Sequence, residues 1–184
     1  MNALRWQMAV DRYEDQAPRW AFTLEDADAQ LLERRIADGA GLLAAHTRWS
    51  ASTPTRSQRA AQGIVELGPL APRAPRSNQV APTTAGARHP VAAGIAPFAV
   101  LDELYEDLDI EADVEVLMTG RQDADPQPLV WTREHGSGRV VVDLLGHDTT
   151  SLEDRSHRAL SRAAGGPAAS EFTGSNREVN APPG

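Results

Sequence analysis

The stretch Trp131-Thr-Arg-Glu-His-Gly-Ser-Gly-Arg-Val-Val-Val-Asp-Leu-Leu-Gly-His-Asp148 indicates how the chain is built. Residues that favour β-structure lie on both sides of His135-Gly-Ser-Gly138, and its two glycines can adopt the positive φ of a tight turn. We therefore expect two strands, at residues 128–133 and 139–144, joined as a hairpin. The second strand leads directly into a Gly-His-Asp corner, which places a histidine beside a carboxylate.

The histidine and the aspartate of this corner are the first candidates for a functional site. Residues 41–45 are apolar at every position, which is typical of a strand covered by helices on both faces, and they end at His46. Ligands bind at the carboxyl ends of parallel strands, and histidine can transfer protons near neutral pH. His46, His147 and Asp148 are therefore the candidate catalytic residues. In the alternative, both histidines are hydrogen-bonded strand-end residues without a catalytic part.

The remaining elements follow from local patterns. A threonine followed three residues later by an aspartate, then apolar residues at helical spacing and a stop at Gly39, predict a helix at residues 24–38. The other predicted elements are strands at residues 3–8 and 113–119 and a surface helix at residues 151–164. No role is assigned to His135 in the turn or to His157 on the surface helix.

Two segments lack such patterns. Residues 47–88 are rich in Pro, Ser, Thr and Arg, and residues 165–184 are small and polar. Because a structureless loop of this length is unusual in a compact domain, the first segment is expected to be poorly ordered and the second to be a disordered tail. A chain of 184 residues is otherwise expected to form one domain, at residues 1–164.

Charge and composition exclude several classes of function. A net charge of -8 and a pI of about 5.1 oppose a nucleic-acid partner, which requires clustered Lys and Arg. No apolar run approaches the ~20 residues that cross a bilayer, and the N-terminus lacks the pattern of a signal peptide, so a cytoplasmic protein without a membrane partner is expected. With no cysteine, thiolate nucleophiles and cysteine-ligated metals are excluded. The residues identify neither a metal nor a cofactor, and they leave the oligomeric state open.

Five blocks, in order along the chain, resemble the ThuA-like (trehalose utilisation) family. They are Gly39-Ala-Gly-Leu-Leu-Ala-Ala-His46, His89-Pro-Val-Ala-Ala-Gly-Ile95, Asp102-Glu-Leu-Tyr105, Pro128-Leu-Val-Trp-Thr-Arg133 and Gly138-Arg-Val-Val-Val-Asp-Leu-Leu-Gly-His-Asp148. The likeness covers most of residues 1–46 and 89–164. It implies a class I glutamine amidotransferase-like fold, a flavodoxin-like parallel sheet between helices, and a loose association with sugar metabolism.

The resemblance also bears on single residues. In amidotransferases of this fold a cysteine nucleophile follows one strand and its histidine partner ends a later one; His46 lies near the first place and His147 near the second. Since the chain has no cysteine, thiol-dependent glutaminase activity is excluded. Asp102 and Glu103 fall in the Asp-Glu-Leu-Tyr block, so one of them is expected to face the crevice and bind substrate, unless it caps a turn. His89, before a proline, is either a further substrate-binding residue or a turn residue.

Two departures from the family pattern stand out. The resemblance implies a further strand and helix before residues 3–8, so we expect this chain to be truncated at its N-terminus. Residues 47–87 also do not match. One nucleotide string that encodes Ala-Val-Val-Cys-Phe-Asp-Thr, the kind of sequence that follows His-Thr in the family, encodes Arg48-Trp-Ser-Ala-Ser-Thr-Pro54 when read one base later. A pair of frameshifts is therefore our hypothesis for this segment, and inspection of the coding DNA tests it.

Three functions remain open from the sequence. The first is a ThuA-like domain that acts on, or regulates the use of, a sugar or sugar derivative. The second is a non-catalytic module that binds a small molecule or another protein. The third is a truncated chain without function.

Overall fold

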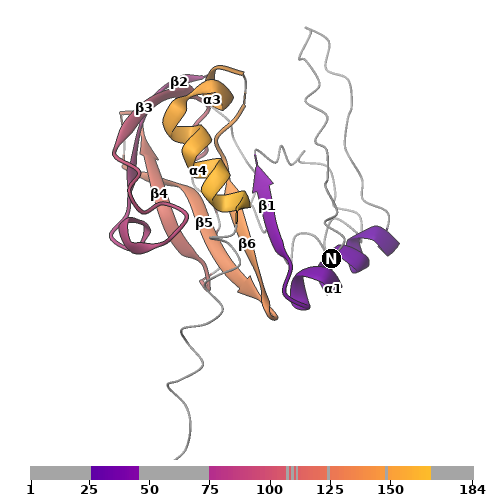
Figure 1. Ribbon diagram of the computed structural model, residues 1–184. Coiled ribbons are helices and arrows are strands. Elements are labelled where there is room, and N and C mark those ends of the chain that lie inside the picture. Colours follow the sequence, from indigo (N-terminus) through magenta and orange to yellow (C-terminus); the bar gives the residue numbers. More distant parts are fainter. Residues whose placement is uncertain are drawn as a thin grey trace, which may run out of the picture.

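The computed structural model describes residues 26–45, 75–106, 108, 110, 112–123, 125–147 and 149–166. The strand expected at residues 3–8, two of the candidate catalytic residues, His46 and Asp148, and nearly all of the predicted tail lie outside these ranges. Within them, the chain forms a mixed α/β structure around one six-stranded sheet (Figure 1). None of the described helices is long and apolar enough to cross a membrane.

The strands follow the order β1-β6-β5-β4-β2-β3 across the sheet. Their bounds are β1 Gly41–Ala45, β2 Arg76–Pro82, β3 Phe98–Asp102, β4 Glu115–Arg121, β5 Gln127–His135 and β6 Gly138–Asp143. Only β1 and β6 pair in parallel, and the four other pairings are antiparallel. The parallel sheet expected from the resemblance therefore holds for one pairing only. The physical reason is the connections, because short turns such as those between β4, β5 and β6 can join only antiparallel neighbours.

Four of the six strands nevertheless run in the same direction. Along the sheet, β1 and β6 are parallel, and the antiparallel neighbours β5 and β2 alternate with β4 and β3. β1, β3, β4 and β6 all end at the same side, which we call the carboxyl end of the sheet. Two pairings define it: Ala45 lies opposite Asp143, and Arg76, the first residue of β2, lies opposite Asp102. The carboxylates of Asp102 and Asp143, from strands far apart in the sequence, are thus brought to one end.

The predicted hairpin and the first helix are confirmed, and they contact each other. Helix α1 spans Asp26–Ala37. Its carboxyl end lies against the β5–β6 turn, where Ser137 N donates to Ala37 O at 2.8 Å. A Cβ at Gly138 would lie 2.0 Å from Ile36 O, so glycine is required there by the close approach of α1. Gly136, with φ +61°, provides the turn itself.

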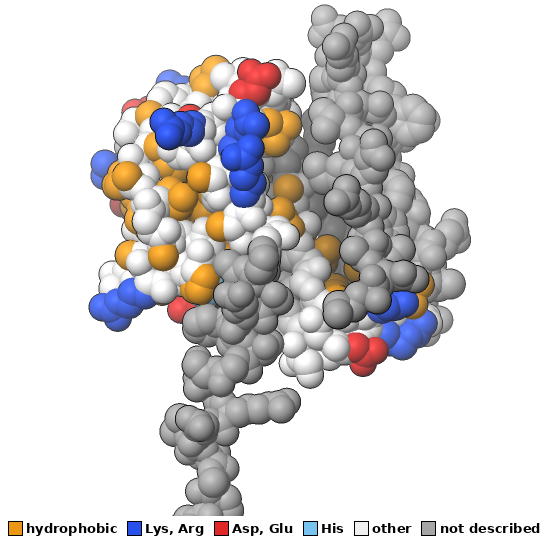
Figure 2. All heavy atoms as spheres, in the orientation of Figure 1, with side chains coloured by type: hydrophobic (Ala, Val, Ile, Leu, Met, Phe, Trp, Pro, Cys, Tyr) orange, Lys and Arg blue, Asp and Glu red, His pale blue; other side chains and the backbone are white. Residues whose placement is uncertain are grey.

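The predicted helix at residues 151–164 is two helices, α3 Thr149–Glu153 and α4 Arg155–Gly165. Asp154 separates them because its carboxylate caps α4, accepting from Ser156 N and His157 N. Helix α4 lies across one face of the sheet (Figure 1), with His157, Leu160 and Ala164 buried. Burying a leucine contributes about 1.5–3 kcal/mol. Basic side chains extend along the outer side of α4 (Figure 2), so one helix face builds the core and the other meets solvent.

Part of the segment expected to be poorly ordered belongs to the sheet. Strand β2 and the 3-10 helix η1, Gly86–Arg88, lie within residues 47–88. β2 is held between β3 and β4, and its Asn78 is fully buried. Asn78 Nδ2 donates to Asp102 O at 2.9 Å. The expectation was wrong here because this strand is stabilised by distant partners and not by an apolar pattern of its own.

Candidate functional site

Asp102, at the end of β3, anchors the loop that follows β6. The residue is 1% exposed. It accepts from Gly146 N at 2.7 Å, from His147 N at 3.3 Å and from the Ser151 hydroxyl. A carboxylate that receives several main-chain N–H groups fixes their positions. Asp102 thus holds the main chain of the Gly-His corner.

The side chain of His147 lies beside Glu103. His147 Nδ1 and Glu103 Oε2 are 3.2 Å apart, and the two side chains are 22% and 13% exposed. Tyr105 Oη donates to the same Glu103 oxygen at 3.1 Å. The carboxylate seen against this histidine is therefore Glu103, whereas Asp148, its predicted partner, lies outside the described residues. The sequence block Asp-Glu-Leu-Tyr contained the signal, because it carries both Glu103 and Tyr105.

A second histidine, which the sequence did not single out, is joined to Asp102 through Ser151. His157 is 2% exposed, so the helix that carries it is not a surface helix at this position. Its Nδ1 lies 2.8 Å from Ser151 O, and its Nε2 lies 3.1 Å from Asp143 Oδ2. Burial alone would lower the pKa of His157, but the hydrogen bond and charge of Asp143, the Ser151 carbonyl and the charge of Asp102 together raise it. The site is thus built on a buried charged network.

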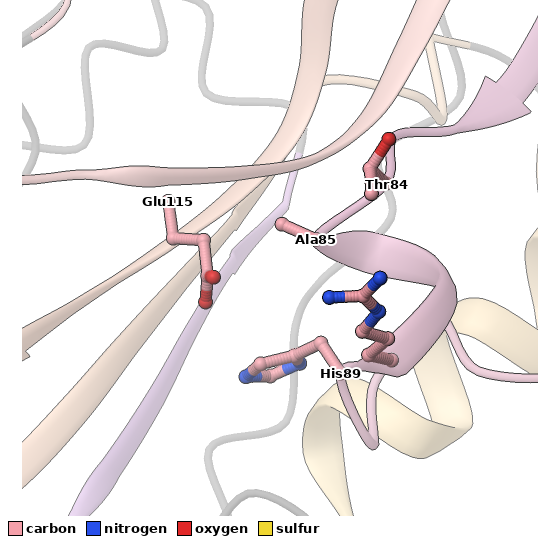
Figure 3. A pocket seen from close by; sticks show the side chains of 5 residues that line it. Thr84, Ala85, His89 and Glu115 are labelled. Atoms are coloured by element: carbon pink, nitrogen blue, oxygen red, sulfur yellow. The ribbon is translucent and has the colours of Figure 1, made fainter.

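His89 lies elsewhere in the molecule. It is buried, and its Nδ1 accepts from Val91 N at 3.2 Å. With Glu115, at the start of β4, it lines a pocket of about 430 Å³ (Figure 3). β4 begins at the end of the sheet opposite its carboxyl end, so His89 is not gathered with Asp102 and Glu103 as the three expected substrate-binding residues would require. Burial lowers the pKa of His89; the charge of Glu115 opposes this, and that of Arg139 adds to it.

Two of the expected catalytic residues cannot be placed beside His147. His46 follows β1 directly but lies outside the described residues, as does Asp148, so their roles stay predictions. Within the described ranges, no group of three or more His, Asp and Glu side chains is arranged to hold a metal ion.

Solved structures share the fold. A ThuA-like protein from Parabacteroides merdae ATCC 43184 has a TM-score of 0.62 and 18% identity, covering 86% of this chain and 68% of that chain. A ThuA-like protein from Bacteroides uniformis ATCC 8492 has a TM-score of 0.61 and 17% identity, covering 80% and 65%. A cold-adapted β-galactosidase from Rahnella sp. R3 is similar over 75% of this chain and 20% of its own, with a TM-score of 0.50 and 14% identity. No curated protein sequence matches the chain.

The fold and the site define a mixed α/β domain with a histidine–carboxylate pair at the carboxyl end of its sheet. The sequence profile of the ThuA family, described as trehalose utilisation, matches residues 17–165. The chain belongs to this family. It spans about two thirds of the length of the two ThuA-like structures.

Proposed function

We propose that this protein binds a sugar or sugar derivative at the carboxyl end of its sheet, where His147 and Glu103 meet. The observation that supports the proposal is the 3.2 Å contact between His147 Nδ1 and Glu103 Oε2, in a pair that is only partly exposed. A carboxylate and an imidazole are the groups that bind and activate sugar hydroxyls. The family's description, trehalose utilisation, supports a carbohydrate as the ligand class.

The chemistry proposed for the pair is proton transfer. Glu103 at Nδ1 favours the tautomer that carries its proton on that nitrogen, which leaves Nε2 as the basic atom of His147. Tyr105, by donating to Glu103, holds the carboxylate in place. The pair would then take a proton from a sugar hydroxyl, or return one, as a general base and acid. The cytoplasmic location stays a prediction.

Binding tests the proposal directly. Trehalose and a panel of mono- and disaccharides are titrated into the protein, and ligand binding is followed by saturation-transfer NMR and calorimetry. Because a hydrogen bond to a charged group contributes about 1.5–3 kcal/mol, Glu103→Gln and His147→Gln should each weaken binding by about tenfold or more. His135→Gln, in the β5–β6 hairpin, is the matched control and should bind as the wild type does.

The outcomes separate an enzyme from a binding module. If a bound sugar is converted on incubation and His147→Gln abolishes the conversion, the pair is catalytic. If sugar binds unchanged over hours, the protein is a binding module, the second function open from the sequence. If no sugar binds, or if binding is equal in all three variants, a carbohydrate site at His147 is excluded.

A further inference from the structure

The ring of His157 is surrounded by acceptors on both of its nitrogens. Nδ1 faces a main-chain carbonyl, Ser151 O at 2.8 Å, and Nε2 faces a carboxylate oxygen, Asp143 Oδ2 at 3.1 Å. A carbonyl oxygen can only accept, so Nδ1 must carry a proton; an ionised carboxylate likewise requires the proton on Nε2. The geometry therefore favours an imidazolium. Ser161 Oγ and Leu145 N also donate to the Asp143 carboxylate, which supports its ionised form.

The hydroxyl of Ser151 connects this cation to Asp102. Ser151 Oγ lies 3.3 Å from His157 Nδ1, whose proton already points to the carbonyl, so the hydroxyl proton goes to Asp102 Oδ2. The same hydroxyl accepts from Gly146 N at 3.2 Å. The main-chain N–H of Gly146 is thus shared between the Ser151 hydroxyl and the Asp102 carboxylate. The side chains of Ser151, Asp102 and His157 are all buried.

Gly146 lies directly against this network. Its φ is +102°, and a Cβ there would lie 3.0 Å from Leu152 Cδ2 and 3.5 Å from His157 Cε1. The space beside Gly146 is therefore closed by α3 and by the histidine ring, and a side chain there would meet both. Since His147 is the next residue, whatever moves Gly146 moves the attachment point of the His147 side chain.

We propose that His157 is a positioning residue: as a buried imidazolium between Asp143 and Asp102, it fixes the Gly146–His147 main chain and so holds His147 against Glu103. This inference rests on the proposed function for its purpose, but not for its evidence. The charged groups that face His157 are Asp143 from β6, Asp102 from β3 and Asp154, which caps α4 at His157 N. All three are acidic, and Asp143 and Asp102 are buried, so a neutral ring would leave these two carboxylates without their cation.

The support that His157 gives to the Gly146–His147 loop depends on pH. The raised pKa of His157 means that the folded protein keeps its proton above the ordinary value of 6.5. The support given to the loop is complete below that pH and is lost as pH rises through the pKa of the folded state.

The test uses the full chain and three variants, His157→Gln, the milder Ser151→Ala, and His135→Gln as control. The ring nitrogens of His157 are followed by ¹⁵N NMR, and hydrogen exchange is measured at the Gly146 and His147 amides. We expect two protonated ring nitrogens at pH 6, and a titration of His157 above the ordinary value of 6.5. We also expect amide protection to fall by about tenfold or more in His157→Gln and in Ser151→Ala. The same fall is expected in the wild type as rising pH removes the proton from His157. A His157 that is neutral at pH 6, or unchanged protection, would overturn the proposal.

A further readout separates positioning from a loss of stability. Glu103→Gln should shift the NMR signals of the His147 ring in the wild-type background, because the two side chains are in contact. In the Ser151→Ala and His157→Gln backgrounds this shift should shrink or vanish. If it is undiminished in folded protein, His157 is structural only, and the proposal fails. None of these measurements requires a sugar, so failure to bind any sugar would overturn the proposed function and leave this result standing.

Discussion

At the scale of the residue, Gly146 shows how tightly the site is built. An L-residue with φ of +102° costs about 1–3 kcal/mol, and a Cβ would also press on Leu152. Gly146→Ala should therefore lower the free energy of unfolding by more than Gly94→Ala, whose φ is +79° but whose Cβ would meet nothing within 4 Å. Urea unfolding measures both. Equal losses would show that strain alone matters and that the loop does not rest closely on α3.

Some residues of the candidate site could be named from the sequence and one could not. His147 and Glu103 were each singled out, the first beside a strand end and the second in a family block. Their contact was not predicted, because it depends on β3 and β6 ending at the same side of a sheet in which three strands separate them. His157 was missed altogether because only the packing of α4 shows that its ring meets Asp143.

At the scale of the element, local patterns predicted α1, β1 and the β5–β6 hairpin. The pattern that indicates each of these elements lies within its own residues, so the local sequence is enough to predict it. The same local patterns did not predict β2, because its Asn78 is stabilised by Asp102 O and Gln122 Nε2, both distant in sequence. Outside the β5–β6 hairpin, strand direction was also beyond the sequence, because the residues of β2, β3 and β4 do not indicate which strands they pair with.

The docking of α1 on the hairpin gives a prediction at this scale. A Cβ at Gly138 would lie 2.0 Å from Ile36 O and 2.3 Å from Ala40 O, which are main-chain atoms that cannot turn aside. Gly138→Ala should lower the free energy of unfolding by about 3 kcal/mol. Gly165→Ala, where the nearest atom would be Leu43 Cδ2 at 3.9 Å, should change it little. Chemical denaturation measures the two variants, and similar values would contradict the close docking.

At the scale of the whole molecule, two buried histidines act on stability in opposite directions. The raised pKa of His157 removes stability as pH rises above 6.5, whereas the lowered pKa of His89 removes it as pH falls below 6.5. Thermal unfolding at pH 5 to 9 should therefore show that His157→Gln flattens the alkaline side of the wild-type curve. His89→Gln should flatten part of the acid side. Parallel curves for wild type and both variants would mean that neither histidine is linked to folding.

The one parallel pairing has a consequence for synthesis on the ribosome. β1 leaves the exit tunnel early, but its partner β6 is made only after β2 to β5, so β1 must wait while nearly all of the sheet is translated. The strands of the β5–β6 hairpin, by contrast, can pair as soon as both have emerged. Until then β1 is an apolar segment whose main-chain groups are not paired with another strand, the kind of surface on which nascent chains associate and which chaperones cover.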